Sequence, residues 1–291
     1  MQQVLSSWRG YLELTKPGVQ ALLFVSCISG MLIGSDFKPP LNTFFFGLLG
    51  ISFLAASSAV INHIFDKQID AKMERTSSRP LVVGDITNNQ AIVFSVFLYL
   101  SGSWMLLTFA NALTWVLTTL TFLFYGFIYT RYLKFMTSQN IVIGGLAGAM
   151  PPLLGWTAIS NTIEPNALLL VLIVMVWTPP HFWALAIHRL DDYSKADVPM
   201  LPVQKGVAFT KQHILLYTVL LFVCTLLPYA TELFNEVYLV CAVILGLIFL
   251  YYSYRLLIDD SNSQAMPTFA YSIVYLGALF SVMLIDFYVY L

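Results

Sequence analysis

An amide and two carboxylates recur at four-residue intervals in the first third of the chain. Asn62, Asp66 and Asp70 are spaced i, i+4 and i+8, so on a helix their side chains share one face. Mg²⁺ accepts such oxygens together with phosphate oxygens and water. Arg75 and Arg79 follow at the same spacing, and guanidinium groups suit phosphate oxygens. This pattern predicts a magnesium–diphosphate site.

The alternative without a catalytic role is a solvated loop whose charges only fix the orientation of the chain in a membrane. That alternative stays open for Lys67, Lys72 and Glu74. It is disfavoured for Asn62, Asp66 and Asp70. Asn62 and Asp66 end a long charge-free run and so lie near membrane depth, where polar and ionisable groups are costly and usually functional.

The composition places the chain in a lipid bilayer. Of its 291 residues, 58% are hydrophobic and 10% are charged, whereas soluble domains carry about 25% charged residues. An aromatic content of 15% argues against disorder. A spanning helix needs about 20 mostly apolar residues. The charge-free runs predict an all-α polytopic fold with nine spans, near 18–35, 42–62, 90–109, 113–130, 141–160, 166–187, 213–230, 236–257 and 268–289.

The basic residues predict the orientation. With nine spans, Lys38 alone among the 14 Lys and Arg residues falls on one side, and the rest fall on the other. The positive-inside rule makes the crowded side cytoplasmic, with the C-terminus outside. No transit peptide is visible, which favours a bacterial inner (plasma) membrane.

A second acidic loop, at 188–212, follows span six as the loop at 62–89 follows span two. Asp192 comes 126 residues, or four spans, after Asp66. This spacing predicts two four-helix repeats plus one helix, forming a single domain over 1–291. Sites often lie where such repeats meet, so we expect the two loops to face each other across a cytoplasmic cavity.

Several longer motifs carry a resemblance to a known family. The chain is similar to the UbiA-type intramembrane prenyltransferases from about residue 11 to 291, and within them to the branch that modifies haem. The residues that carry the resemblance are Asn62 through Leu81, Tyr129–Lys134, Asn140–Gly145, Pro151-Pro152, Gly155-Trp156, Trp177–Ile187, Asp192-Tyr193 and Val198–Pro202, with Thr15-Lys16-Pro17 a weaker echo.

The resemblance implies an activity and roles for the residues. It implies transfer of the farnesyl group of farnesyl diphosphate to a vinyl group of haem B, a substrate rather than a cofactor, with water addition to give haem O. Asp66, Asp70 and Asp192 would bind Mg²⁺, and Asn62 would orient the metal or a phosphate oxygen. Many relatives have three acids in the second loop, where this chain has His188, Asp192 and Ala196. The diphosphate would bind Lys72, Arg75 and Arg79.

Other features are weaker. His181 is the preferred haem ligand, beside Pro179-Pro180, which should break or kink its helix. Gly144, Gly145 and Gly148 predict close helix packing. Aromatic rings such as those of Tyr125 and Tyr129 are candidates to shield a cation. We expect no nucleic-acid partner, whereas a haem A synthase or terminal oxidase is a candidate partner.

Two alternatives remain. Another prenyltransferase of the same type, acting on an aromatic acceptor such as 4-hydroxybenzoate, would share the first loop but should carry a fuller set of acids in the second. A secondary transporter would also fit nine spans and a repeat, but transporters keep coupling carboxylates near the bilayer midplane. Here the acids lie at or near the predicted membrane faces.

Overall fold

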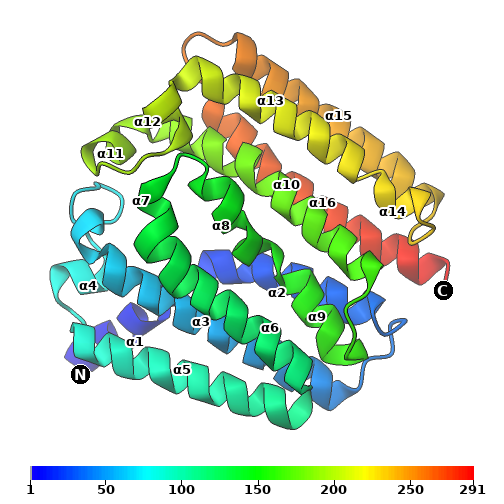
Figure 1. The fold of residues 1–291 in the computed structure, drawn as a ribbon, viewed down its shortest axis with the longest axis horizontal. Helices are drawn as coiled ribbons and strands as arrows, with labels where there is room; N and C mark the ends of the chain where they lie inside the picture. Colours follow the sequence, from blue (N-terminus) through cyan, green and yellow to red (C-terminus); the bar gives the residue numbers. More distant parts are fainter. Residues whose placement is uncertain (1) are drawn as a thin grey trace.

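The computed structural model describes residues 2–291, and their side chains from Trp8 onward. All regular structure in this part is helical (Figure 1). The elements are α1 (Gln2–Leu14), α2 (Pro17–Ile33), α3 (Leu41–Asp70), α4 (Pro80–Val83), α5 (Asn88–Phe109), α6 (Ala112–Leu123), the π-helix η1 (Phe124–Leu133), α7 (Lys134–Met136), α8 (Asn140–Ala149), α9 (Pro151–Ser160), α10 (Pro165–His188), α11 (Leu190–Lys195), α12 (Leu201–Lys205), α13 (Val207–Cys224), α14 (Leu227–Ala230), α15 (Glu236–Ile258) and α16 (Ala265–Val289).

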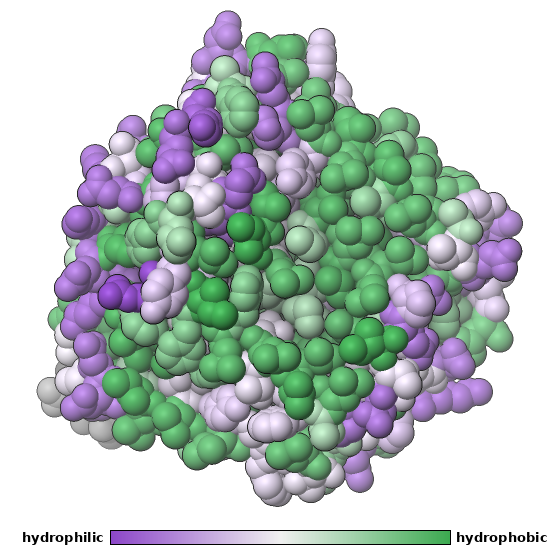
Figure 2. Space-filling view, viewed as in Figure 1, coloured by the Kyte–Doolittle hydropathy of each residue, from purple (hydrophilic) through white to green (hydrophobic). Residues whose placement is uncertain are grey.

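The predicted spans correspond to long apolar helices. Among the described residues, eight helical segments are long and apolar enough to cross a membrane, and a ninth arises if Trp8–Leu14 and Pro17–Ile33, bent by 54°, count as one span. Hydrophobic residues form a broad central zone, and hydrophilic residues gather toward the two ends of the helices (Figure 2). The chain is therefore a polytopic membrane protein, as predicted.

The connecting segments divide between the two ends of the bundle. The end carrying α4, α11 and α12, here called the loop face, lies at the left and upper left of Figure 1, and α14 and the C-terminus lie at the right. In the first half α3 packs against α5, and in the second half α10 packs against α13 and α13 against α15. The largest contact between the halves is that of α2 with α9. The last helix, α16, contacts α2, α10 and α15, so it joins the halves.

Local sequence sets several helix boundaries. Thr87 forms a capping box with Gln90 at the start of α5, and Asn111 caps α6 at the predicted turn. Pro151 separates α8 from α9, as expected of a residue without a backbone N–H. The fully buried Asp286 of α16 accepts backbone N–H bonds from Asn235 and Tyr238 at 2.7 and 2.9 Å, which caps α15 from a neighbouring helix.

Two local details differ from expectation. Pro179 and Pro180 do not break their helix, since both lie inside an uninterrupted α10 that continues to His188, with α8, α13 and α16 packed around it. The acidic stripe does not continue into the arginines, since α3 ends at Asp70 and the chain then turns. Arg75 and Arg79 therefore belong to a loop.

Candidate active site

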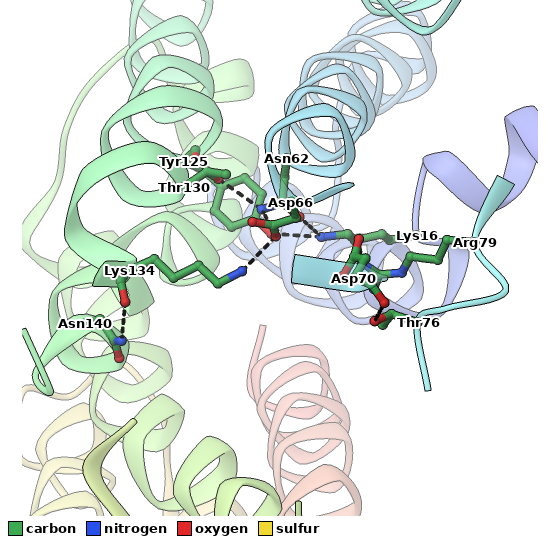
Figure 3. Close-up of polar contacts among 10 residues, drawn as sticks. All are labelled: Lys16, Asn62, Asp66, Asp70, Thr76, Arg79, Tyr125, Thr130, Lys134 and Asn140. Atoms are coloured by element: carbon green, nitrogen blue, oxygen red, sulfur yellow. Dashed lines mark hydrogen bonds and ion pairs between the residues drawn. The ribbon is translucent and has the colours of Figure 1, made fainter. Parts of the chain in front are cut away.

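The predicted stripe occupies the last three turns of α3, at the loop face. Asn62, Asp66 and Asp70 are only 3%, 5% and 4% exposed. Figure 3 shows their side chains lying along one side of the helix, surrounded by basic groups from other elements. Because buried carboxylates are stable only when paired or hydrogen-bonded, each partner is informative about the site.

Asp66 is matched by a lysine from the π-helical end of span four. Lys134 Nζ lies 2.8 Å from Asp66 Oδ2, and the Lys134 side chain is 12% exposed. Asn62 Nδ2 donates to the same carboxylate at 2.9 Å and to Thr130 Oγ1 at 3.0 Å. The π-helix η1 thus brings Thr130 to α3, and α7, which follows it directly, brings Lys134. Such π-helical segments are frequent at functional sites.

Asp70 is matched by an arginine that folds back from the following loop. Arg79 Nη1 lies 2.6 Å from Asp70 Oδ2, and Thr76 Oγ1 donates to the Asp70 carbonyl at 2.9 Å. The spacing placed Arg79 one turn beyond the stripe. In the structure it pairs directly with Asp70, the last carboxylate of the stripe.

Lys16 completes the polar cluster from the break between α1 and α2. Its φ of 54° is in the left-handed region, which is unusual for a residue with a side chain. Pro17, which begins α2, disfavours the right-handed helical conformation at the preceding residue. The Lys16 ammonium donates to Asn62 Oδ1 and, at 3.2 Å, to the Tyr125 hydroxyl.

The second acidic loop meets the first at the loop face. Met73 is buried in one apolar cluster with Tyr193 and Val198. Burial raises the pKa of the Tyr193 hydroxyl, which the neighbouring Arg75 guanidinium opposes. Asp192 is half-buried beside Tyr193, and its carboxylate has no hydrogen-bond or ion-pair partner among the described side chains. The loops are therefore adjacent, as predicted.

The remaining predicted diphosphate ligands are solvent-exposed. Arg75 is exposed, and Lys72 lies 4.0 Å from the exposed Asp197 carboxylate. Solvent and salt weaken such a contact, which leaves Lys72 available to another anion.

The donor set suits a hard cation, although it is not assembled around one point. Asp66 Oδ1 is buried without a hydrogen-bond partner, and so is Asn140 Oδ1. Within residues 2–291, no group of three or more His, Cys, Asp or Glu side chains converges as a metal cluster. Asp66 and Asp70 are instead neutralised by Lys134 and Arg79. Carboxylate and amide oxygens fit Mg²⁺ chemically, and the assignment of Asp66, Asp70 and Asp192 stays a prediction.

An apolar cavity of about 130 Å³ opens directly beneath this cluster. Lys16 and Tyr125 line its mouth, and it runs between α2, α3, α6 and the α8–α9 pair. Tyr125 stacks on Tyr129 with ring centroids 5.6 Å apart. A charged headgroup bound at Asn62 and Asp66 would therefore have an apolar compartment immediately below it.

His181 projects from α10 against α16. Its ring stacks on Trp177 and on Phe269, with centroids 4.2 and 4.6 Å away. His181 Nδ1 lies 2.6 Å from Ser272 Oγ, which also lies 2.6 Å from the Phe269 carbonyl oxygen. Donation of the single hydroxyl proton to that carbonyl leaves Ser272 Oγ to accept from His181 Nδ1–H. Nε2 of the neutral ring then carries a lone pair and has no hydrogen bond to the described side chains.

Comparison with known proteins identifies the family. The chain matches the UbiA prenyltransferase family over residues 23–280. The chain belongs to this family. A protoheme IX farnesyltransferase of Alcanivorax borkumensis is 54% identical over 97% of this chain and 93% of its own length. Proteins of the same name from Saccharophagus degradans and Methylococcus capsulatus are each 51% identical over 98% of this chain and 94% and 96% of their own lengths.

Solved structures of the UbiA type share the fold. A structure described as digeranylgeranylglyceryl phosphate synthase has a TM-score of 0.81 and 23% identity, covering 97% of this chain and 99% of its own. A UbiA homologue from Archaeoglobus fulgidus, bound to GPP and Mg²⁺, has a TM-score of 0.68 and 17% identity, covering 94% and 99%. Both likenesses confirm the predicted architecture of this UbiA family member.

Sequence reasoning missed three polar side chains of the site: Lys16, Thr130 and Lys134. Lys16 and Lys134 lie in motifs that carried the resemblance, but their spacing relative to Asn62 and Asp66 gives no indication of contact. For Lys16 and Lys134 the sequence did indicate depth. Both are lysines at the loop-face end of a span, and they therefore lie at the depth of the acidic stripe.

Removing one partner of the Asp70–Arg79 pair should destabilise the protein more than removing both. Arg79→Met leaves the Asp70 carboxylate buried and unpaired, with an expected cost of about 3 kcal/mol. Adding Asp70→Asn should recover most of that loss, since no charge then stays buried. Unfolding in mixed detergent micelles measures both changes. Lys72→Met, which breaks only an exposed contact, is the matched control, and equal losses in the single and double variants would contradict the pairing.

Proposed function

We propose that this protein transfers the farnesyl group of farnesyl diphosphate to a vinyl group of haem B, adds water, and releases diphosphate and haem O. The observation that carries the proposal is identity of 51–54% over nearly the whole chain to proteins named protoheme IX farnesyltransferase. The basic and acidic side chains gathered above an apolar cavity fit a substrate with a charged head and an apolar tail.

The diphosphate binds at the loop face, against the end of α3. Asp66, Asp70 and Asp192 would hold Mg²⁺, and the ion would supply positive charge to offset the negative charge that builds on the leaving group. The chain itself supplies cations from three directions. Lys16 reaches in from the α1–α2 break, Lys134 from the start of α7, and Arg79 from the loop after α3. Lys72 and Arg75 lie at the exposed rim of the same loop.

The present pairing explains how the site is stable before substrate binds. Lys134 and Arg79 neutralise Asp66 and Asp70, so no carboxylate of the stripe is left as a bare buried charge. Carboxylates that held a cation would leave the ammonium of Lys134 and the guanidinium of Arg79 free to donate to diphosphate oxygens. Opposite charges would then be matched both with and without substrate.

The reaction needs no nucleophile from the protein. The bond between the allylic carbon and the diphosphate oxygen breaks, and its electron pair leaves with the diphosphate. The π electrons of the haem vinyl group form the new carbon–carbon bond. Water then adds to the resulting cation and loses a proton, which gives the hydroxyl group of haem O. The ring of Tyr125, which lines the cavity and stacks on Tyr129, would stabilise positive charge on the allyl group.

His181 is the proposed haem contact. Its Nδ1–H is held by Ser272, which leaves the Nε2 lone pair for the iron, and the stacked rings of Trp177 and Phe269 fix its plane. A hydrogen bond on the far nitrogen is the usual way in which proteins orient a ligating imidazole.

The proposed setting is a bacterial inner membrane with the loop face in the cytoplasm. The crowding of Lys and Arg onto the loops of that face supports this orientation. A haem A synthase or a terminal oxidase remains a candidate neighbour, because each would use the product.

Mass spectrometry of the haem product tests the proposal. Purified protein in lipid, supplied with farnesyl diphosphate, Mg²⁺ and haem B, should convert haem B to a species heavier by one farnesyl group and one hydroxyl group. The same reaction with 4-hydroxybenzoate should give no product. Prenylation of the aromatic acid without any change in haem would overturn the proposal in favour of the aromatic-acceptor alternative.

Asp66→Asn should lower farnesyl transfer at least about 100-fold, a typical loss when one electrostatic contact to a developing charge is removed. The amide retains the shape of the side chain, so the variant should stay folded by size-exclusion chromatography. Asp197→Asn is the matched control, because that carboxylate is exposed and contacts only Lys72. Turnover of Asp66→Asn at the wild-type rate, with the same Mg²⁺ dependence, would refute the metal role.

His181→Ala should weaken haem binding at least about tenfold and shift the Soret band, because the axial ligand is lost. A haem titration followed by absorbance measures both effects. His188→Ala, which alters an exposed imidazole seven residues further along the chain, should leave them unchanged. An unaltered spectrum and affinity in His181→Ala would exclude ligation.

A further inference from the structure

On every helix that lines the cavity, the lining residues run from the polar cluster at the loop face toward the interior of the bilayer. Its upper residues include Ala59 on α3 and Tyr125 on η1. Its deepest residues are Cys27 on α2, Ile51 on α3 and Leu154 on α9, with Thr118 on α6 at a similar depth. The cavity is therefore an elongated compartment that points from the loop face into the bilayer.

One wall of this compartment is built from small side chains. Ser52, Ala55, Ser58 and Ala59 present it along α3. Residues three and four apart share a helix face, so this pattern leaves a continuous strip with little side-chain volume. The small side chains of this strip leave space for an extended apolar chain beside α3.

The compartment is closed at its deep end. Met31 is fully buried below Cys27, and a Cβ added at Gly47 would lie 3.3 Å from the Met31 methyl group. The Thr114 hydroxyl donates to Thr157 Oγ1 at 2.9 Å, which ties α6 to α9 below the cavity.

Backbone contact between α2 and α9 makes this closure rigid. A Cβ at Gly30 would lie 2.0 Å from the Pro152 carbonyl oxygen, and one at Gly155 would lie 2.1 Å from the Cys27 carbonyl oxygen. The backbones of α2 and α9 are therefore in direct contact at this depth, and a longer chain could pass between them only if the two helices moved apart.

The distance from headgroup to floor is fixed by one helix. Asn62 and Ile51 are separated by eleven residues of α3, which at 1.5 Å per residue is about 16 Å. We propose that this compartment measures the isoprenoid chain, and that Ile51 and Leu154 at its floor select three isoprene units over four. The inference rests on the proposed function, because it takes the headgroup to bind at Asn62 and Asp66.

Gly148 provides a direct way to shorten the compartment. It lines the cavity on α8, and a Cβ added there would meet no atom within 4 Å. Its neighbours differ, since added Cβ atoms at Gly144 and Gly145 would lie 2.4 Å from Tyr129 and 3.0 Å from Thr178. The prediction of close packing therefore holds for Gly144 and Gly145 and is wrong for Gly148, which faces open space.

Competition among geranyl, farnesyl and geranylgeranyl diphosphates tests the inference. Mass spectrometry would give the share of each chain length in the product, and displacement by unreactive thiodiphosphate analogues would give affinities without turnover. Gly148→Leu should raise the geranyl-to-farnesyl ratio of kcat/KM at least about tenfold. Leu154→Ala should raise the geranylgeranyl-to-farnesyl ratio by a similar factor, since removing three side-chain carbons opens space at the floor for the added isoprene unit.

Two variants outside the cavity serve as matched controls. Gly277→Leu introduces the same side chain at a glycine of α16 that also has open space, and Leu153→Ala removes the same volume beside Leu154 in another buried cluster. Both should retain the wild-type preference. Unchanged ratios in Gly148→Leu and Leu154→Ala, in protein that still transfers farnesyl, would overturn the inference alone. Absence of prenyl transfer to haem by the wild-type protein would instead count against the proposed function.

Discussion

The pairing of buried carboxylates with cations from distant segments is the constraint on which the loop face depends. Asp66 and Asp70 are almost fully buried on α3, and burial of an unpaired carboxylate would cost several kcal/mol. Lys134 and Arg79 satisfy them from the fourth span and from the following loop. The acidic stripe therefore positions the junction of η1 with α7 and the loop that leads into α4. The same contacts concentrate positive charge at the mouth of the apolar cavity.

Local departures from ideal helices make that concentration possible. The π-helix at Phe124–Leu133 directs Thr130 toward Asn62 and lies just before Lys134, while a left-handed backbone at Lys16 directs its ammonium to the same amide. Pro151 breaks the fifth span where it crosses α2. Regular helices would present these side chains on other faces, so the irregular segments are part of how the site is assembled.

Much of this architecture could be predicted from the sequence, because membrane burial leaves clear marks in charge-free runs and basic loops. The i, i+4, i+8 spacing located Asn62, Asp66 and Asp70 on one face, and the four-span interval brought the second loop to the same end of the bundle. The partners of the stripe were not predictable. Arg79 reaches Asp70 through a turn, and Lys134 depends on the register of a π-helix, which no periodicity reveals. For the same reason, the open space at Gly148 could not be told from the packed positions at Gly144 and Gly145.

The position of α16 has a consequence for biosynthesis. This helix is the last to be made, yet it contacts α2 from the first half and α10 and α15 from the second, and its Asp286 supplies the missing acceptors at the start of α15. A nascent chain that has inserted every earlier span has the α2–α9 contact between its halves but lacks the contacts of α16 with both, and it leaves the backbone donors of Asn235 and Tyr238 unsatisfied at the start of α15. The molecule therefore gains its full set of helix contacts only after its last span has been made, and a chain truncated before that span should be degraded by membrane quality-control proteases.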